Sequence, residues 1–346
     1  MNKKLGLTAL GAAMAIGLTA CGGEGAGAAS GEAPAATAAP EELTIGVSMP
    51  TQTSERWIAD GNAVKSQLEE AGYKVELQYA NDDIPTQGQQ IDQMLTQGAD
   101  LLIVAAIDGT ALSSQLQAAA DQNVKVISYD RLIRETENVD FYVSFDNFKV
   151  GVAQGTALLT GLGVLNADGS AGTATGPFNV ELFAGSLDDN NAGFFFDGAM
   201  SVLQPKIDDG TRVDGVLSPY DGLSRGIITA LQNAGYGPNL TSTPSPLPVV
   251  TGQDAEIASV KLIADGTQFA TIFKDTRKLA EQAVTSAESF LAGEEPEAND
   301  TETYDNGVKV VPSFLLESDI VYADNIQSLL IDTEYWTEEQ VASGQA

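Results

Sequence analysis

Short runs of β-branched and aliphatic residues alternate along the chain with longer segments whose apolar residues recur at helical spacing. In the first half, the pattern predicts strands at residues 43–48, 75–79, 101–105, 124–128 and 141–144, with helices at 57–71, 91–97 and 112–121. Strands that alternate with helices favour right-handed βαβ units and therefore a parallel, doubly wound sheet.

A second series of the same kind follows. It predicts strands at residues 179–184, 213–217, 247–251 and 268–273, with helices at 194–207, 223–234 and 255–264. Residues 41–346 are enough for two domains of ordinary size. The pattern therefore predicts an α/β fold with two doubly wound parallel-sheet lobes.

The first 42 residues follow a different pattern. Lys3 and Lys4 precede an apolar stretch at residues 5–18 that is too short to span a bilayer, and small residues lead to Cys21, as in a secretory signal. The sequence LTAC at 18–21 resembles the bacterial lipobox, in which the signal is removed and the cysteine is acylated. Residues 22–40 are almost wholly Gly, Ala, Ser, Pro, Thr and Glu. We expect a signal peptide at 1–20 and a flexible lipoprotein stalk at 21–42; the alternative is an unmodified cysteine.

Charge and residue types exclude several functions. The formal net charge of −31 would repel phosphate backbones and anionic lipid surfaces, so we expect no binding to nucleic acid. The chain has no histidine, which removes Ser-His-Asp and Cys-His nucleophile systems and histidine-based metal sites. With Cys21 as its one cysteine, it forms no internal disulfide. We expect neither a metal nor a cofactor.

Polar and aromatic residues gather directly after the predicted strands, where open α/β sheets bind their ligands. In the first series these residues are Ser54, Arg56, Trp57, Asp108, Asp130, Arg131, Asp146 and Asn147. In the second they are Asp188, Asp189, Asn190, Asn191, Tyr220, Asp221, Gln253, Asp254, Lys274 and Asp275. Carboxylates, amides and cations that can each bind two hydroxyls, beside an indole for an apolar ring face, are typical of a carbohydrate site. Each acid or amide could instead cap the following helix, and Trp57 could be a packing residue.

Nine segments carry a resemblance to a known family. They are SERW at 54–57, ANDDIP at 80–85, IDGT at 107–110, YDRLIR at 129–134, FDN at 145–147, GSLDDNNA at 185–192, LSPYDG at 217–222, VTGQDA at 250–255 and TIFKD at 271–275. In these segments the chain resembles the periplasmic sugar-binding proteins of the ribose and xylose class, and most closely the multiple-sugar-binding receptors. The resemblance spans nearly the whole mature chain.

The resemblance implies a ligand site, a hinge and partners. Arg56 and Trp57 would form one wall, Asp130 and Arg131 would bind hydroxyls from the first lobe, and Asn147 would stand at the hinge. From the second lobe, the residues that would meet the ligand are Asp188, Asn190, Asn191, Asp254 and Lys274. Three crossovers near Asp146, Phe273 and Pro312 would divide the chain into a lobe of 43–146 plus 276–311 and a lobe of 147–275 plus 312–346.

One interval departs from the family pattern. Relatives have a further strand and helix, with an aromatic residue that faces the sugar, where this chain has only residues 208–212. We therefore expect the second lobe to be one βα unit short. Phe194, Phe195 or Phe196 could replace the aromatic face, although packing against other helices is the alternative.

The leading hypothesis is a monomeric, extracytoplasmic receptor, anchored by lipid at the outer face of the cytoplasmic membrane or in the periplasm. It would bind an aldose such as galactose, glucose, xylose or arabinose by hinge closure and deliver it to an ABC permease. A sensory lipoprotein with the same pocket is the alternative. A glycosidase that uses two of Asp188, Asp221 and Asp254 is a rival from another class. The signal and stalk leave no place for the basic helix-turn-helix of a repressor.

Overall fold

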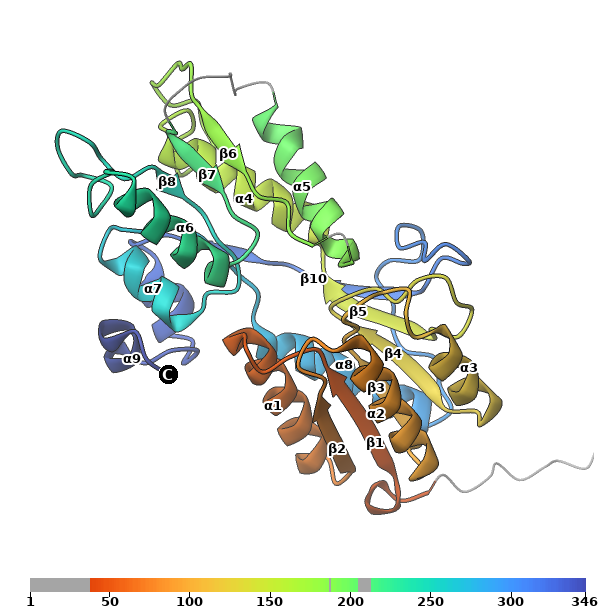
Figure 1. Cartoon of the computed structure of the whole chain (residues 1–346). Coiled ribbons are helices and arrows are strands. Elements are labelled where there is room, and N and C mark those ends of the chain that lie inside the picture. Colours follow the sequence, from red (N-terminus) through yellow and green to blue (C-terminus); the bar gives the residue numbers. More distant parts are fainter. Residues whose placement is uncertain (1–37, 187, 205–212) are drawn as a thin grey trace, which may run out of the picture. The chain divides into compact units, whose positions relative to one another are not determined.

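The computed structural model describes residues 38–186, 188–204 and 213–346, which contain two regions of β-sheet with flanking helices (Figure 1). The predicted signal and nearly all of the predicted stalk lie outside these residues. The last stalk residues, Pro40–Glu42, form one 3-10 turn before the first strand. Among the described helices, none is both long and apolar enough to cross a bilayer.

The first lobe, as we define it, is built on a six-stranded sheet in which every neighbouring pair is parallel. Its strand order is β10-β5-β4-β3-β1-β2. The strands are β1 (Thr44–Met49), β2 (Lys74–Tyr79), β3 (Leu101–Val104), β4 (Lys125–Tyr129), β5 (Phe141–Phe145) and β10 (Ser313–Leu316). Apart from β10, this is the strand series that the sequence predicts.

Helices cover both faces of this sheet, and the alternation along each strand explains why. Helices α1 (Glu55–Glu70) and α8 (Thr276–Leu291) pack on the face that receives Leu101 and Ile103. Helices α2 (Ile84–Thr96) and α3 (Ser113–Asp121) pack on the face that receives Leu102 and Val104. Successive strand residues point to opposite faces, so a continuous apolar run fills two cores.

The second lobe holds a three-stranded parallel sheet in the order β6-β7-β8, formed by Val180–Leu182, Gly215–Leu217 and Val249–Val250. Strand β9 (Thr271–Phe273) pairs antiparallel with β11 (Asp319–Val321). The helices of this lobe are α4 (Asn147–Gly161), α5 (Asn190–Leu203), α6 (Asp221–Asn233), α7 (Ile257–Ala264) and α9 (Glu338–Ser343), with a π-helical turn at Gln327–Ile331. The interval 208–212, in which the sequence predicts a missing βα unit, lies outside the described residues.

Some sequence-based expectations differ from the structure, and helix α4, the start of helix α2 and the last lobe boundary are the main cases. The pattern does not predict helix α4, because its own small and apolar residues lie on several faces of the helix and its hydrophobic periodicity is therefore weak. Helix α2 begins seven residues before the expected residue 91, since Asp83 accepts a hydrogen bond from the main-chain N–H of Thr86 and Pro85 lies in the first turn. The expected boundary at 311/312 places β10 in the second lobe, whereas β10 pairs with β5 inside the first-lobe sheet.

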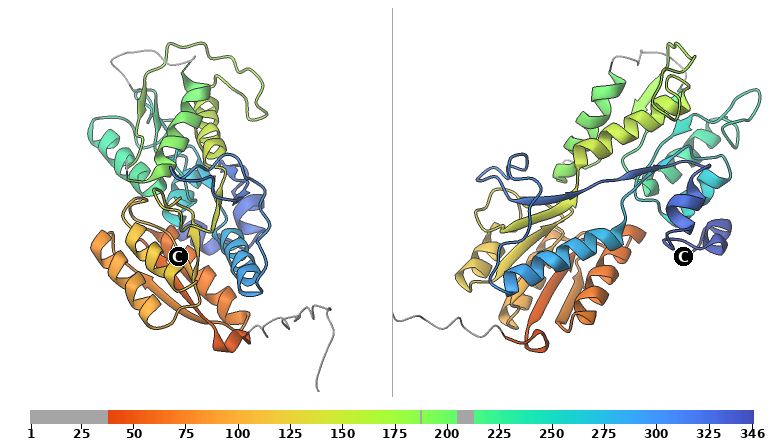
Figure 2. Two further views of the ribbon diagram at one scale, coloured as in Figure 1. Left: turned by 90° about the vertical axis from the view of Figure 1, so that its right-hand side faces the viewer. Right: turned by 180° about the vertical axis from the view of Figure 1, so that it is seen from behind.

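The chain instead crosses between Leu316 and Asp319. Figure 2 shows β10 and β11 as successive parts of one extended run, the first beside β5 and the second on β9. Residues 313–316 therefore belong to the first lobe. The sequence pattern indicates where a strand forms. Which strand it pairs with depends on the sheet edge beside which the folded chain places it.

Helices α4 and α5 approach each other closely through glycine. A Cβ atom on Gly198 of α5 would overlap the carbonyl oxygen of Phe148 and lie 3.0 Å from the main-chain nitrogen of Val152. A Cβ on Gly151 of α4 would likewise overlap the carbonyl oxygen of Phe195. Because these neighbours are main-chain atoms, a side chain at either position has to push the helices apart.

We expect Gly198→Ala to lower the free energy of unfolding by about 1–3 kcal/mol, as overpacking in a core does. Gly193→Ala in the same helix is the matched control, because a Cβ atom there would have no neighbour within 4 Å. The control should raise stability by up to about 1 kcal/mol through helix propensity. Urea unfolding measures both. Equal stability of the two variants would contradict the close helix contact.

Candidate functional site

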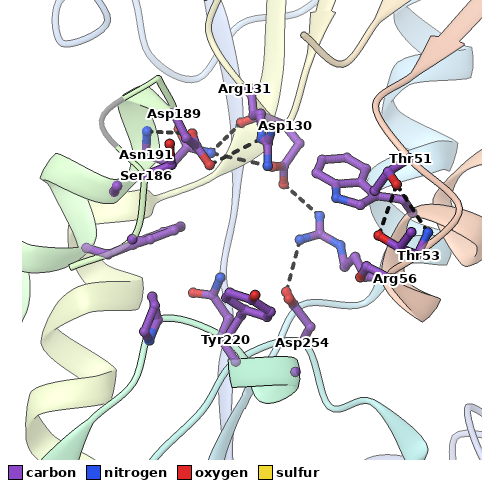
Figure 3. Close-up of a pocket in the computed structure, with 18 of the residues that line it drawn as sticks. Thr51, Thr53, Arg56, Asp130, Arg131, Ser186, Asp189, Asn191, Tyr220 and Asp254 are labelled. Atoms are coloured by element: carbon purple, nitrogen blue, oxygen red, sulfur yellow. Dashed lines mark hydrogen bonds and ion pairs between the residues drawn. The ribbon is translucent and has the colours of Figure 1, made fainter. Parts of the chain in front are cut away.

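A pocket of about 500 Å³ is lined by residues of both lobes (Figure 3). The first lobe contributes the loop after β1 with the start of α1, and the loop after β4. The second lobe contributes the loop before α5, the start of α6, the segment 253–256 and the residue after β9. These are the carboxyl ends of the strands, where the fold predicts a ligand.

The guanidinium of Arg56 is the centre of the pocket wall. Its Nε donates to Asp60 Oδ2 at 2.9 Å, one terminal nitrogen donates to Asp130 Oδ2 at 2.6 Å, and the other to Asp254 Oδ1 at 3.1 Å. Asp254 belongs to the second lobe, so this cation joins the two lobes directly. Figure 3 shows the side chains of Asp130 and Asp254 converging on Arg56.

Lys274, the residue after β9, adds a second positive charge beside Asp130 and Asp254. Its side chain is only 2% exposed, and Nζ lies 3.2 Å from Asp254 Oδ1 and 4.0 Å from Asp130 Oδ2. The same Nζ lies 5.5 Å from the centroid of the Phe195 ring. Two cations thus face two pocket carboxylates, and buried charges of this kind persist only when they are paired.

Trp57 both lines the pocket and packs in the core of the first lobe. The guanidinium carbon of Arg56 lies 5.3 Å from the centroid of its ring, and that of Arg131 lies 5.0 Å from it. Trp57 is therefore a packing residue that also has a surface in the pocket. A flat apolar surface beside two cations suits a ring with polar edges.

A second cross-lobe contact is formed by Arg131 and the start of α5. Arg131 Nε lies 3.2 Å from Asp189 Oδ2. Asn191 donates from Nδ2 to the main-chain oxygen of Asp130 at 2.8 Å. The loop before α5 is thereby held against the loop after β4, and both loops line the pocket.

The pKa values of the two first-lobe carboxylates on Arg56 shift in opposite directions. Burial and, to a smaller extent, the nearby charge of Asp130 raise the pKa of Asp60 to about 6, against the opposing charge of Arg56. Burial also acts to raise the pKa of Asp130, but Arg56 and Lys274 outweigh it and lower that pKa to about 2. Asp130 is thus the ionised partner, whereas Asp60 takes up a proton more readily and accepts from the Tyr129 hydroxyl at 2.7 Å.

Nine of the thirteen side chains predicted to bind ligand line this pocket. They are Ser54, Arg56, Trp57, Asp130, Arg131, Asp188, Asn191, Asp254 and Lys274. The capping alternative is wrong for Asp254, because the N-cap residue of α7 is Glu256. The Asp254 carboxylate instead contacts two cations across the pocket.

The other four predicted ligand residues lie outside the pocket lining. Asp108 accepts from the main-chain N–H and the hydroxyl of Thr110, which is a local turn contact. Asn190 is the first residue of α5 and is half-buried. Asn147 is buried behind the pocket, where its Nδ2 donates to Asn191 Oδ1 at 3.1 Å. Asn147 therefore positions a lining residue.

Asp221 is the clearest correction. Its side chain is 0% exposed. Oδ1 accepts from Gln268, while Oδ2 accepts from the Thr271 hydroxyl and the main-chain N–H of Glu256. Both oxygens are thus engaged inside the second lobe. Asp221 fixes the segment that carries Asp254, and it does not face the pocket.

Several further side chains line the pocket without being among those thirteen. They are Thr51, Thr53, Asp82, Ile107, Ser186, Asp189, Phe195, Tyr220, Arg225, Gln253 and Glu256. Phe195 is one of the three phenylalanines that could supply an aromatic face. Asp189, Tyr220 and Gln253 belong to the polar runs after the strands, where position alone does not separate ligand contacts from caps. No local sequence pattern points to Arg225 or Glu256, because the 2.7 Å ion pair between them joins segments 31 residues apart.

A pH experiment tests the Asp60 environment. Because the pKa of Asp60 is higher in the folded chain than its ordinary value near 4, the folded state binds the proton more tightly, and stability rises as the pH falls through 6. Between pH 7 and pH 5 this group should add about 1 kcal/mol to the free energy of unfolding. Asp130 does not contribute in this window, since its pKa is below its ordinary value.

Asp60→Asn should lose this gain, whereas Asp121→Asn, an exposed substitution of the same kind, should keep it. Urea unfolding at the two pH values measures the difference for each variant. The same pH dependence in the Asp60 variant and the wild type would contradict the raised pKa.

Comparison with known proteins places this geometry in a family. Residues 45–211 and 207–295 match the periplasmic binding protein domain family. The chain is 48% identical to the multiple sugar-binding periplasmic protein SbpA of Azospirillum brasilense, over 88% of this chain and 92% of that protein. It is also 48% identical to the multiple sugar-binding periplasmic receptor ChvE of Rhizobium radiobacter, over 88% and 93%.

A solved structure agrees with these sequence relatives. An ABC transporter solute-binding protein of Clostridium phytofermentans, crystallised with β-D-glucose, superposes with a TM-score of 0.78 at 39% identity, over 86% of this chain and 99% of that one. The parallel α/β lobes and the pocket at the strand ends agree with these comparisons. The chain belongs to the periplasmic binding protein family and has its type I fold.

Proposed function

We propose that the protein is an extracytoplasmic receptor for a monosaccharide, an aldose of the galactose, glucose, xylose or arabinose type, and that it delivers this sugar to an ABC importer. One observation carries the proposal: Asp130, Arg56, Asp254 and Lys274 form a charge-balanced set that both lobes supply, beside the Trp57 ring. Such a set offers donors and acceptors to hydroxyl groups without a large net charge that would favour an ionic ligand.

The relatives support a sugar as the ligand class. Two proteins of 48% identity are named for binding multiple sugars, and the solved structure of 39% identity holds β-D-glucose. A pocket of about 500 Å³ has the size typical of small-molecule sites. We infer that the nine predicted residues that line it contact the sugar.

Binding would proceed by hinge closure of a monomer. We divide the chain into a lobe of residues 43–146 with 276–316 and a lobe of residues 147–275 with 319–346. A ligand that contacts both lobes stabilises the closed arrangement over the open one by its differential affinity. No chemistry on the sugar is part of this proposal. The glycosidase alternative is weakened because Asp221, one of its three candidate carboxylates, is enclosed by the second lobe.

Attachment to the outer face of the cytoplasmic membrane through Cys21 is also part of the proposal. The support is the LTAC sequence at 18–21 and the Gly- and Ala-rich residues that follow. Acyl chains stabilise membrane attachment by about 0.8 kcal/mol per buried CH₂, and lasting anchorage needs more than one chain. An anchored receptor would stay near its permease.

The ligand proposal is tested by calorimetric titration with glucose, galactose, xylose and arabinose, with an amino acid and a nucleotide as controls. At least one aldose should bind, and Asp254→Ala should weaken its binding about ten- to a hundredfold, because a charge-assisted hydrogen bond is lost. Asp265→Ala is the control, since Asp265 is an exposed residue of the same lobe outside the pocket lining. Heat of binding with the amino acid alone, and with none of the sugars, would reject the proposed ligand class.

The anchor is tested separately by Cys21→Ser. This variant should pass from the membrane fraction to the soluble fraction after a high-salt wash, while its affinity for sugar stays the same. If it still sediments with membranes, the attachment is not through an acylated Cys21.

A further inference from the structure

The first turns of α1 and α7, one from each lobe, meet beside the pocket. Ser54, the N-cap residue of α1, donates from Oγ to Glu256 Oε1 at 3.1 Å. Glu55, the first residue of α1, accepts at Oε2 from the main-chain N–H of Ile257 at 3.1 Å. Ile257 is the first residue of α7. The two helices are thus joined by reciprocal contacts between their first turns.

Neither N-cap side chain forms a capping bond to its own helix. Ser54 makes no such bond to α1, and Glu256 makes none to α7. The side chain of Glu256 instead binds Ser54 and Arg225, the latter at 2.7 Å. The free N–H groups of a first helical turn favour a carboxylate. For α7, Glu55 of the other lobe supplies that carboxylate.

Glu55 differs from its neighbours in one respect. Ser54, Arg56 and Glu256 line the pocket, whereas Glu55 does not. Its second oxygen, Oε1, is buried and has no hydrogen-bond partner among the described residues. The charges that face its carboxylate are those of Glu256 and Arg225. Because Glu55 joins the lobes without lining the pocket, its direct route to ligand affinity is closure.

We propose that Glu55 is a positioning residue for ligand binding: by capping α7 from the opposite lobe, it stabilises the closed arrangement and sets the affinity for every ligand by one common factor. This inference rests on the proposed binding by hinge closure. Ligand affinity is the intrinsic affinity of the closed state scaled by its population. Glu55→Ala removes the cap, so the open state gains population without any change to the pocket.

The first test compares two sugars. If two aldoses bind the wild type, Glu55→Ala should weaken both by the same factor, about three- to thirtyfold, and should increase their dissociation rates. Glu55→Gln keeps an acceptor oxygen and should recover part of the loss. Glu70→Ala is the control, because Glu70 lies exposed at the other end of α1. Calorimetry gives the affinities, and stopped-flow fluorescence gives the rates.

The second test needs no sugar. Dyes on Gln122→Cys at the C-cap position of α3 and Asn233→Cys at the end of α6, in the Cys21→Ser full chain, report the distance between the lobes by energy transfer. Without ligand, the Glu55→Ala variant should show a larger population of the open state than the wild type. This outcome is independent of which ligand the protein binds.

The outcomes separate the two proposals. Wild-type affinity and rates in Glu55→Ala, with unchanged energy transfer, would overturn the role of Glu55. A changed preference between the two sugars would also overturn it, since it would show a direct effect on the pocket. Failure of the wild type to bind any aldose would overturn the proposed function, and the energy-transfer comparison would then still decide whether Glu55 holds the lobes together.

Discussion

The burial of the Arg56 guanidinium is the constraint on which the rest of the site depends. An arginine removed from water needs its charge compensated, and here three carboxylates from three separate segments do so. Asp60 lies one turn further along α1, Asp130 follows β4, and Asp254 lies in the second lobe. The fold has to bring these segments together, because a buried guanidinium without carboxylate partners would carry an uncompensated charge.

Much of the fold could be predicted from the sequence, because the strands of a parallel sheet that is covered on both faces are short, continuous apolar runs. Residues 101–104 are the clearest case, since all four are buried and alternate between two cores. Helix α4 could not be found in the same way. Its glycines at 151 and 155 serve close contact with α5, and such contact leaves no periodic signal. The partner of β10 could not be found either, because pairing is decided by which sheet edge the chain reaches.

The site could be predicted where a side chain acts close to its own strand end. Asp130, Arg131 and Lys274 follow their strands directly and reach the pocket. Asp221 and Asp108 occupy similar positions in the sequence, yet their carboxylates satisfy main-chain groups of their own lobes. Whether such a carboxylate reaches the pocket or stays within its own lobe depends on which main-chain N–H groups lack a partner in the folded chain. The order of residues does not show this. Contacts between distant segments, such as Glu256 with Arg225 in its own lobe or with Ser54 in the other, have no sequence signal at all.

The same residues explain how the pocket can be both charged and suited to a neutral ligand. Each cation in the lining is already paired: Arg56 and Lys274 with Asp130 and Asp254, Arg131 with Asp189, and Arg225 with Glu256. A hydroxyl group that enters can donate to a carboxylate and accept from the cation beside it without leaving either charge alone. An ionic ligand would have to compete with a partner that is already in place. The pairing that makes burial of Arg56 tolerable is therefore also what favours a polyhydroxylated ligand over a charged one.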